Sequence, residues 1–488
     1  MKNVKNNSSS TGSKLGMWAL AAIVVSSMIG GGIYSLPQNM AASASAGAVL
    51  LAWLITGIGI FFIAKTFSIL SLVKPELTTG IYSYSRAGFG SYVGFIIGWS
   101  YWLCQVCGNV GYAVITMDAL NYFFPGFFAG GNNLASIIGG SLIIWGFNFL
   151  VLRGIKQASI VNTIGTVVKI LPLLFFIIVM VFLFHLDKFD FNFWGEDALP
   201  RSDLGSLSKQ IRSTMLVTLW SFIGIEGAVV MSSKAKSASL IGPATIIGFL
   251  CCLGIYILLS LLPFGYMHQA ELAGIANPST AGILEHAVGR WGAWIMNIGL
   301  IISVLTSWLA WTLVTAQIPQ AAAVDGTFPP MFAKENKFAA PSVSLIVTSA
   351  AMQLFLLLVY FSNNAWNTML SITSVMVLPA YLASCAYLWK ICEDGEYPKD
   401  SVFGRSYALI TATLGAIYAL WLIYAAGLKY LLLAVIIIAL GIPVYICARR
   451  KNAPDEPIFD CREKALLLLT LVLAAVALYA ICRGLVSI

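Results

Sequence analysis

The chain has 488 residues, of which 59% are hydrophobic and only 10% charged, and its mean hydropathy is +0.87. A typical soluble domain is about 25% charged, so this composition excludes a soluble enzyme, and its apolar content excludes a disordered scaffold. The net charge of +8 does not indicate nucleic acid, because the basic residues lie in short loops between apolar runs. The sequence predicts an all-α polytopic membrane protein whose surroundings are the lipid bilayer.

Thirteen apolar runs approach the roughly 20 residues that a spanning helix needs. They lie near residues 17–40, 47–70, 89–118, 134–152, 158–184, 211–232, 240–267, 289–318, 342–361, 366–390, 406–426, 428–447 and 464–485. If the N-terminus is inside, most of the 28 lysines and arginines fall in inside segments. Cytoplasmic loops carry this excess of positive charge, so we expect a cytoplasmic N-terminus, with residues 1–14 as a disordered tail.

The nine cysteines mostly lie inside apolar runs. Cys104 and Cys107 form a C-x-x-C pair, but no second cluster of Cys or His accompanies them, so we expect neither a metal site nor a cofactor. A membrane-embedded enzyme would need a nucleophile–base pair, or a cluster of carboxylates and histidines, at the same depth in the bilayer. Glu226 is the only carboxylate well inside a predicted span, whereas Asp118 lies at a span end. The sequence therefore argues against an enzyme.

The first span contains the triplet Gly30-Gly31-Gly32. Three consecutive glycines weaken a helix strongly, and a break within lipid exposes N–H groups that must find partners. A substrate carboxylate suits them, because the positive end of the helix dipole lies there. Close helix packing through small residues is the alternative, and the glycines alone do not decide between the two.

The sixth span, Trp220-Ser221-Phe222-Ile223-Gly224-Ile225-Glu226-Gly227, contains a second glycine-bracketed break together with a carboxylate. Two breaks at corresponding positions of two five-span halves are typical of inverted-repeat transporters with a midplane site. Glu226 is then a candidate gating and proton-sensing residue. The alternative is a structural glutamate bonded to neighbouring backbone.

These motifs resemble the amino acid–polyamine–organocation transporter superfamily, in its basic amino acid/polyamine antiporter branch. Five segments carry the resemblance, which covers about residues 15–450: Ile29–Ile33 with Leu36-Pro37, Gly80–Tyr84, Tyr101–Asn109, Trp220–Glu226, and Trp311–Leu313 with Ala323–Gly326. The resemblance implies a 5+5 inverted-repeat core, about 17–184 and 211–390, followed by two accessory helices. Residues 464–485, after a polar break, would add a thirteenth transmembrane helix.

The resemblance also implies a set of site residues. The substrate carboxylate would meet the amides of the glycine triplet, and its amino group the carbonyls near Met28 and Trp220–Ile223. Trp220 would stack on the cationic group, Trp311 would form a distal gate, Tyr101 a proximal gate with Glu226, and Asn109 would lie near the substrate. Agmatine exchangers carry Ser where this chain has Gly31, which removes a hydroxyl contact but not the backbone contacts. The candidate substrate-binding set is Met28, Gly30, Gly31, Gly32, Tyr101, Cys104, Asn109, Trp220, Ser221, Ile223 and Trp311.

Lys169 lies within the fifth span, where a lysine must pair, snorkel or be neutral. The resemblance implies that it takes the place of a sodium ion. Family members exchange external arginine for intracellular agmatine or ornithine in a bacterial inner membrane, and the sequence does not decide between these partners. The alternative is a proton-coupled permease for another cationic amino acid such as lysine. A homodimer stays open, because some relatives are dimers.

Overall fold

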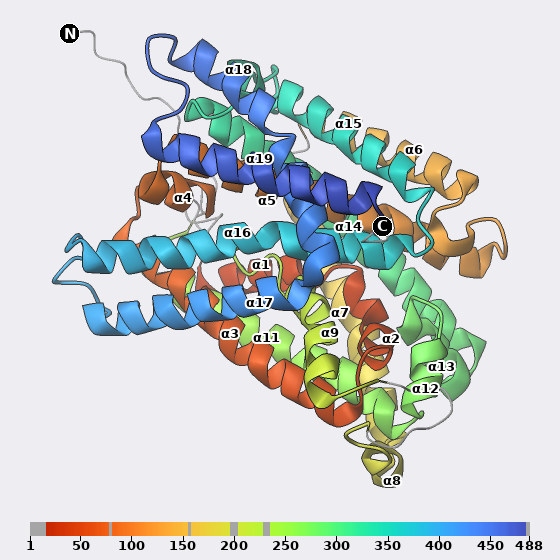
Figure 1. Ribbon diagram of the computed structural model, residues 1–488. Coiled ribbons are helices and arrows are strands. Elements are labelled where there is room, and N and C mark those ends of the chain that lie inside the picture. The colour runs from red at the N-terminus through yellow and green to blue at the C-terminus, as the bar shows by residue number, and fades with distance from the viewer. Residues whose placement is uncertain (1–15, 78–80, 155–157, 196–203, 228–234, 485–488) are drawn as a thin grey trace.

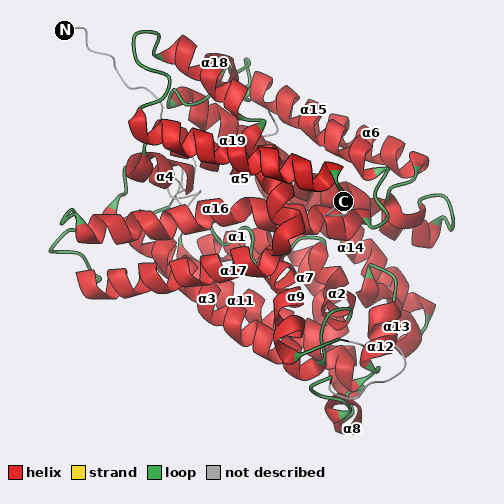
Figure 2. Ribbon diagram, in the orientation of Figure 1, coloured by secondary structure: helices red, strands yellow, loops and turns green. Residues whose placement is uncertain are grey.

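The computed structural model describes residues 16–77, 81–154, 158–195, 204–227 and 235–484, and for residues 158–167 and Ala238 it describes the backbone alone. The tail predicted over residues 1–14 lies outside these ranges. Every element within the described part of the chain is a helix (Figure 2). This confirms the all-α prediction.

The helices follow one another along the chain with short connections (Figure 1). Their bounds are α1 (Met17–Met28), η1 (Gly32–Ser35), α2 (Leu36–Ala41), α3 (Ala46–Val73), α4 (Ile81–Phe89), α5 (Ser91–Phe123), η2 (Ala129–Gly131), α6 (Leu134–Leu152), α7 (Ala158–Phe182), α8 (Leu186–Asp190), α9 (Leu207–Ser221), η4 (Ala238–Leu240), α11 (Ile241–Leu261), η5 (Leu262–Gly265), α12 (Gln269–Gly274), α13 (Ser279–Val288), α14 (Arg290–Val324), η6 (Pro330–Ala333), α15 (Ser342–Val359), α16 (Ala365–Glu393), α17 (Arg405–Ala439), α18 (Ile442–Asn452) and α19 (Cys461–Cys482).

Helices of membrane-spanning length and polarity dominate the molecule. Within the described ranges, nine helical segments are long and apolar enough to cross a bilayer, or ten if the bent pair formed by α1 and Gly32–Ala41 counts as one span. Two further predicted spans, 158–184 and 211–232, include or adjoin residues outside the description. The chain is therefore polytopic, as its composition predicts.

The predicted boundary between the spans 406–426 and 428–447 falls at a kink within α17, where two helical segments meet at Gly427. α17 and α18 together cover Arg405–Asn452, 48 residues, or roughly 72 Å at 1.5 Å per residue. A bilayer core is only about 30 Å thick, so this segment is long enough to cross twice. It turns at Gly427, whose φ of 76° and ψ of 158° are not helical. The predicted boundary is thus a kink, and the second span is interrupted after Ala439.

The last helix, α19, begins three residues before its predicted start. The Asp460 side chain accepts a hydrogen bond from the Glu463 amide, and the Glu463 side chain accepts one from the Asp460 amide, so the two form a capping box. Glu463 Oε1 also accepts a bond of 2.8 Å from the Tyr92 amide at the start of α5. This ties the start of α19 to the start of α5, although most of α19 is exposed. That α19 spans the bilayer stays a prediction.

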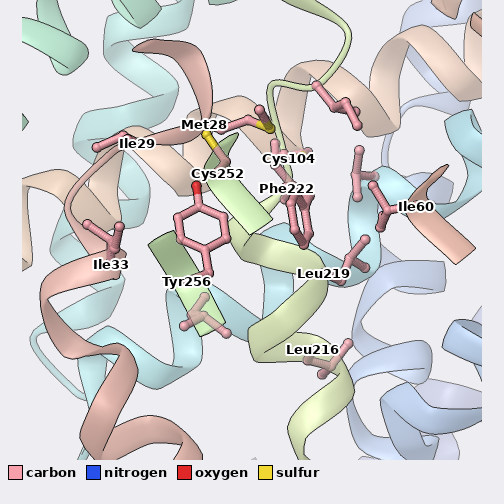
Figure 3. Close-up of a cluster of buried hydrophobic side chains, with 14 of the residues drawn as sticks. Met28, Ile29, Ile33, Ile60, Cys104, Leu216, Leu219, Phe222, Cys252 and Tyr256 are labelled. Atoms are coloured by element: carbon pink, nitrogen blue, oxygen red, sulfur yellow. The ribbon is translucent and has the colours of Figure 1, made fainter. Parts of the chain in front are cut away.

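The interior is a continuous apolar core around the two helix breaks. Phe222 packs against Trp53 of α3 and Tyr256 of α11, with ring centroids 6.2 and 5.3 Å away. Figure 3 shows Met28 and Cys104 approaching the same cluster from α1 and α5. Because buried aromatic groups resist displacement, this cluster fixes the point at which the broken segments meet.

Candidate functional site at the two helix breaks

The first helix breaks at the glycine triplet. α1 ends at Met28, the 3₁₀ turn η1 starts at Gly32, and the two flanking segments are bent by 51°. Pro37 lies in the first turn of α2. Backbone N–H groups in the first turn have no partner within the helix, so the missing N–H of proline costs no hydrogen bond there. The break predicted from the glycines is confirmed.

The second break follows α9. This helix ends at Ser221, and residues 222–226 form turns. Gly224 has a φ of +105°, a conformation that L side chains rarely adopt. Ser27 Oγ donates to the Gly224 carbonyl over 2.7 Å. The two breaks, far apart in sequence, are therefore in direct contact.

Two of the three backbone amides of the glycine triplet at the first break are left without partners in the described structure. The Gly30 amide is engaged, because it donates to the Met28 carbonyl over 3.0 Å. The amides of Gly31 and Gly32, by contrast, have no acceptor among the described residues. Unpaired amides inside a membrane are costly, so these two N–H groups form a candidate anion-binding site at the start of a helical segment. That the Gly31 and Gly32 amides bind a substrate carboxylate stays a prediction.

A small cavity lies between the breaks and α5. Its volume is about 30 Å³, enough for roughly one or two water molecules. This conformation is therefore closed around the site. Six predicted site residues line the cavity, namely Met28, Gly30, Asn109, Trp220, Ile223 and Trp311.

Trp220 lies directly against the glycine triplet. A Cβ atom at Gly32 would fall 1.3 Å from Trp220 Cζ3, well inside van der Waals contact. The other side of the indole meets Trp366 edge-on, with centroids 5.2 Å apart and planes at 90°. The Trp220 ring thus occupies a position that only glycine at residue 32 permits.

One face of α5 supplies most of the polar lining. Asn109 Nδ2 donates to the Gln105 carbonyl over 2.7 Å and to Thr315 Oγ1 of α14 over 3.1 Å. Asn109 Oδ1 and Gln105 Nε2 have no partner among the described atoms. A buried unpaired acceptor beside an unpaired donor is suited to a polar ligand.

Five lining residues were not predicted: Ser27, Gln105, Gly108, Tyr112 and Thr373. Three of them could have been found, because Gln105, Gly108 and Tyr112 repeat at helical spacing on the face that carries Asn109. Thr373 lies on α16, and no sequence signal links it to the site. The remaining predicted residues, Gly31, Gly32, Tyr101, Cys104 and Ser221, lie close by but do not line this cavity.

Two of those residues are engaged elsewhere. Ser221 Oγ donates to the Val217 carbonyl over 3.0 Å, and Cys104 is fully buried in the apolar cluster near Met28 and Phe222 (Figure 3). Their side chains therefore act in packing in this conformation. Any role toward substrate stays a prediction.

Glu226 is buried, with 1% of its surface exposed, and it collects three donors. Tyr101 Oη donates to Oε1 over 2.5 Å, while Tyr381 Oη and the Gly224 amide each donate to Oε2 over 3.2 Å. The structure thus brings Tyr101 and Glu226 together, as expected for a shared gate. Tyr381 of α16 is a third member that the sequence did not indicate. This carboxylate links α5, α16 and the second break.

Lys169 of α7 is also buried and has only oxygen partners. Its Nζ donates to the Ser26 carbonyl over 2.7 Å, to Ser26 Oγ over 2.9 Å and, more weakly, to Ser307 Oγ over 3.4 Å. None of the salt bridges between described residues involves it. The ammonium therefore ties α7 to the last turn of α1 and to α14, beside the first break.

Comparison with known proteins identifies the family of the chain. The sequence model of the amino acid permease family matches residues 15–448. The chain belongs to the amino acid permease family. This permease is 60% identical over 475 residues to a protein of Chlamydia abortus named arginine/agmatine antiporter, with 97% of this chain and 98% of the relative covered. Proteins of the same name from Chlamydia pneumoniae and Chlamydia trachomatis serovar L2 are 59% and 58% identical, over 97% and 96% of this chain and 98% and 96% of theirs.

The family identifies this permease as a multi-pass membrane transporter of small molecules rather than an enzyme. Within the described residues no group of three or more His, Cys, Asp or Glu side chains could hold a metal ion.

Proposed function

We propose that this permease exchanges external arginine for internal agmatine across a bacterial inner membrane, with its N-terminus in the cytoplasm. The observation that carries the proposal is the match, at 58–60% identity over nearly the full length of both chains, to proteins named for this exchange. The small cavity between the two helix breaks supports it, because its lining suits a guanidinium compound.

The backbone at the breaks suits the amino acid end of arginine. The free Gly31 and Gly32 amides would donate to the carboxylate, assisted by the positive end of the helical segment that follows. The α-ammonium group would meet carbonyl oxygens near Met28 and Ile223, which both line the cavity. Agmatine lacks the carboxylate, so these amides would have no anion in the agmatine-bound state.

The aromatic wall suits the guanidinium group. A cation stacked on an indole face gains about 2 kcal/mol when both are shielded from water. Trp220 and Trp311 both line the cavity, and Asn109 Oδ1 supplies an unpaired acceptor beside them. The aromatic wall binds a cation without placing a fixed charge of its own beside it. The site therefore accepts both the singly charged substrate and its doubly charged product.

The arrangement of the core supports transport by alternating access. We propose that residues about 17–184 and 211–390 form inverted repeats whose two broken helices meet at Ser27 and Gly224, with α17 and α18 as accessory segments. The cavity of about 30 Å³ cannot hold arginine, so uptake requires the walls to separate. Trp311 would move as the distal gate, and Tyr101 with Glu226 as the proximal gate.

Glu226→Gln is expected to remove the pH dependence of exchange while arginine binding is retained. The amide oxygen can accept from the Gly224 N–H and Tyr381, and the amide nitrogen can donate to Tyr101, whose hydroxyl also accepts. The geometry survives and only the titratable group is lost. Exchange rates from pH 5 to 8, with arginine binding measured in parallel, check this. An unchanged pH profile would exclude a protonation role.

Lys169 is expected to make transport independent of sodium. Its ammonium group already contacts a carbonyl and two hydroxyl oxygens beside the first break, the kind of ligands that a sodium ion would take. Replacing external sodium with choline should leave the arginine uptake rate within about 20%. Uptake that requires sodium would contradict the role given to this lysine.

Counterflow in liposomes tests the proposed function. The purified protein is reconstituted with arginine, agmatine, ornithine, lysine or nothing inside, and labelled arginine is supplied outside. Rapid arginine uptake against internal agmatine, and little into empty liposomes, is the expected result. Uptake against ornithine but not agmatine would reassign the partner. Uptake into empty liposomes driven by a pH gradient would mean a proton-coupled permease.

A further inference from the structure

A second, larger cavity lies outside the site at the breaks. Its volume is about 860 Å³, within the range of ligand pockets. Five helices contribute to its wall: the end of α5, the start of α14, and the short helices α8, α12 and α13. Figure 1 shows α12 and α13 together at one end of the molecule, opposite α18.

Carboxylates dominate the charge of this cavity. Asp118, Glu271 and Glu285 line it, against the single ammonium group of Lys188. Lys188 Nζ is engaged by the Tyr266 carbonyl at 2.8 Å, and Glu271 is engaged in capping α12. Asp118 has no hydrogen bond or ion pair with any described residue. A concave wall of this charge concentrates cations.

Buried amide oxygens at the cavity wall indicate a ligand that donates hydrogen bonds. Asn297 of α14 lines the cavity and is only 1% exposed, and its Nδ2 donates to the Ala293 carbonyl over 3.0 Å. Its Oδ1 has no partner, and neither has Oδ1 of Asn277, which also lines the cavity. Buried acceptors without donors are uncommon in native proteins. A guanidinium or primary ammonium group would satisfy them and neutralise Asp118 together.

The cavity is connected by its helices to the site at the breaks. On α5, Asp118 lies nine residues beyond Asn109, or about 14 Å along the axis. On α14, Asn297 lies fourteen residues before Trp311, or about 21 Å. The solvent exposure of the lining residues decreases inward: Glu271 at the rim is exposed, Asp118 is half-buried and Asn297 is buried. A cation moving inward would therefore meet carboxylates first and the aromatic wall later.

We propose that this acidic cavity is a second, outer binding site for the cationic group of the substrate, with Asp118 and Asn297 as its specific ligands. The proposal rests on the proposed function, because it takes guanidinium and amine compounds as the substrates. The site captures arginine before the closed inner site opens, and it holds agmatine after release.

External Michaelis constants for arginine test this in liposomes loaded with agmatine. Asp118→Asn should raise KM three- to tenfold at low ionic strength, with the maximal rate within twofold of wild type. Asp118→Glu should restore the wild-type KM, and Asn297→Ala should raise it. Asp190→Asn is the matched control, because this exposed carboxylate of α8 does not line the cavity. An unchanged KM in Asp118→Asn, or a reduced maximal rate that Asp118→Glu does not restore, would overturn the proposal.

Equilibrium binding separates failure of this site from failure of the proposed function. In a Trp220→Leu/Trp311→Leu background, labelled agmatine should still bind weakly, and adding Asp118→Asn should lower that binding at least fivefold. Absence of weak binding, or binding indifferent to Asp118, would overturn the outer site. This assay needs no transport, so a wild-type protein that fails to exchange arginine for agmatine would refute only the proposed function.

Discussion

Gly32→Ala is expected to lower arginine exchange at least 100-fold. The added Cβ would lie 1.3 Å from Trp220 Cζ3 and 1.9 Å from Cη2, and real Cβ atoms essentially never approach closer than 3.0 Å. Either the indole leaves its position or the first break shifts, and both changes alter the site. Exchange rates in liposomes, normalised to the amount of inserted protein, measure the loss.

Two variants make that result specific. Gly146→Ala on α6 is the matched control and should retain wild-type exchange. Apart from the adjoining backbone of its own helix, no atom of the described residues lies within 4 Å of the added Cβ. If the clash with Trp220 is the cause, Trp220→Leu added to Gly32→Ala should recover thermal stability without recovering exchange. Wild-type exchange by Gly32→Ala alone would show that the closed arrangement of Trp220 against the glycine triplet is not used in transport.

Trp220→Leu is expected to remove the preference for cationic substrates while leaving membrane insertion normal. The lost stacking interaction, about 2 kcal/mol, corresponds to roughly 30-fold in arginine affinity. Neutral amino acids lose no such interaction, so the ratio of arginine to neutral affinity should fall toward one. Competition binding with arginine and its neutral analogue citrulline measures this ratio directly.

Controls separate stacking from packing, since Trp220 also contacts Trp366. Trp220→Phe keeps an aromatic face and should retain most of the preference. Trp389→Leu removes an exposed indole of α16 that does not line the cavity and should behave as wild type. Wild-type arginine affinity in Trp220→Leu would refute the stacking role.

The breaks were predictable because glycine leaves a strong local signal. The triplet Gly30–Gly32 and the pair Gly224 and Gly227 each mark a point where a helix is weakened. The structure confirms a helix break at both points. The position of Glu226 within a span marked it as a candidate, and resemblance to a family added Tyr101. The structure brings these two residues together. Local backbone preference and family motifs therefore account for the two helix breaks and for the pair Tyr101 and Glu226.

Contacts made only by folding were not predictable. Thr373 and Tyr381 lie on α16 among apolar residues, and nothing in their sequence neighbourhood marks them. The contact between Ser27 and Gly224 depends on how two distant spans cross. The outer cavity combines Asp118 with short helices that no hydropathy pattern indicates. In each case the missing information is tertiary packing, which sequence spacing does not contain.

The dependence of exchange on membrane potential tests the central claim most directly. Arginine carries one positive charge and agmatine two, so each cycle moves one net positive charge outward, worth about 2.3 kcal/mol per 100 mV. Liposomes loaded with agmatine are given a potassium-set potential, and labelled arginine uptake is followed. We predict uptake that is accelerated by an inside-positive potential and slowed by an inside-negative one. Uptake at the same rate under both potentials would contradict arginine/agmatine exchange.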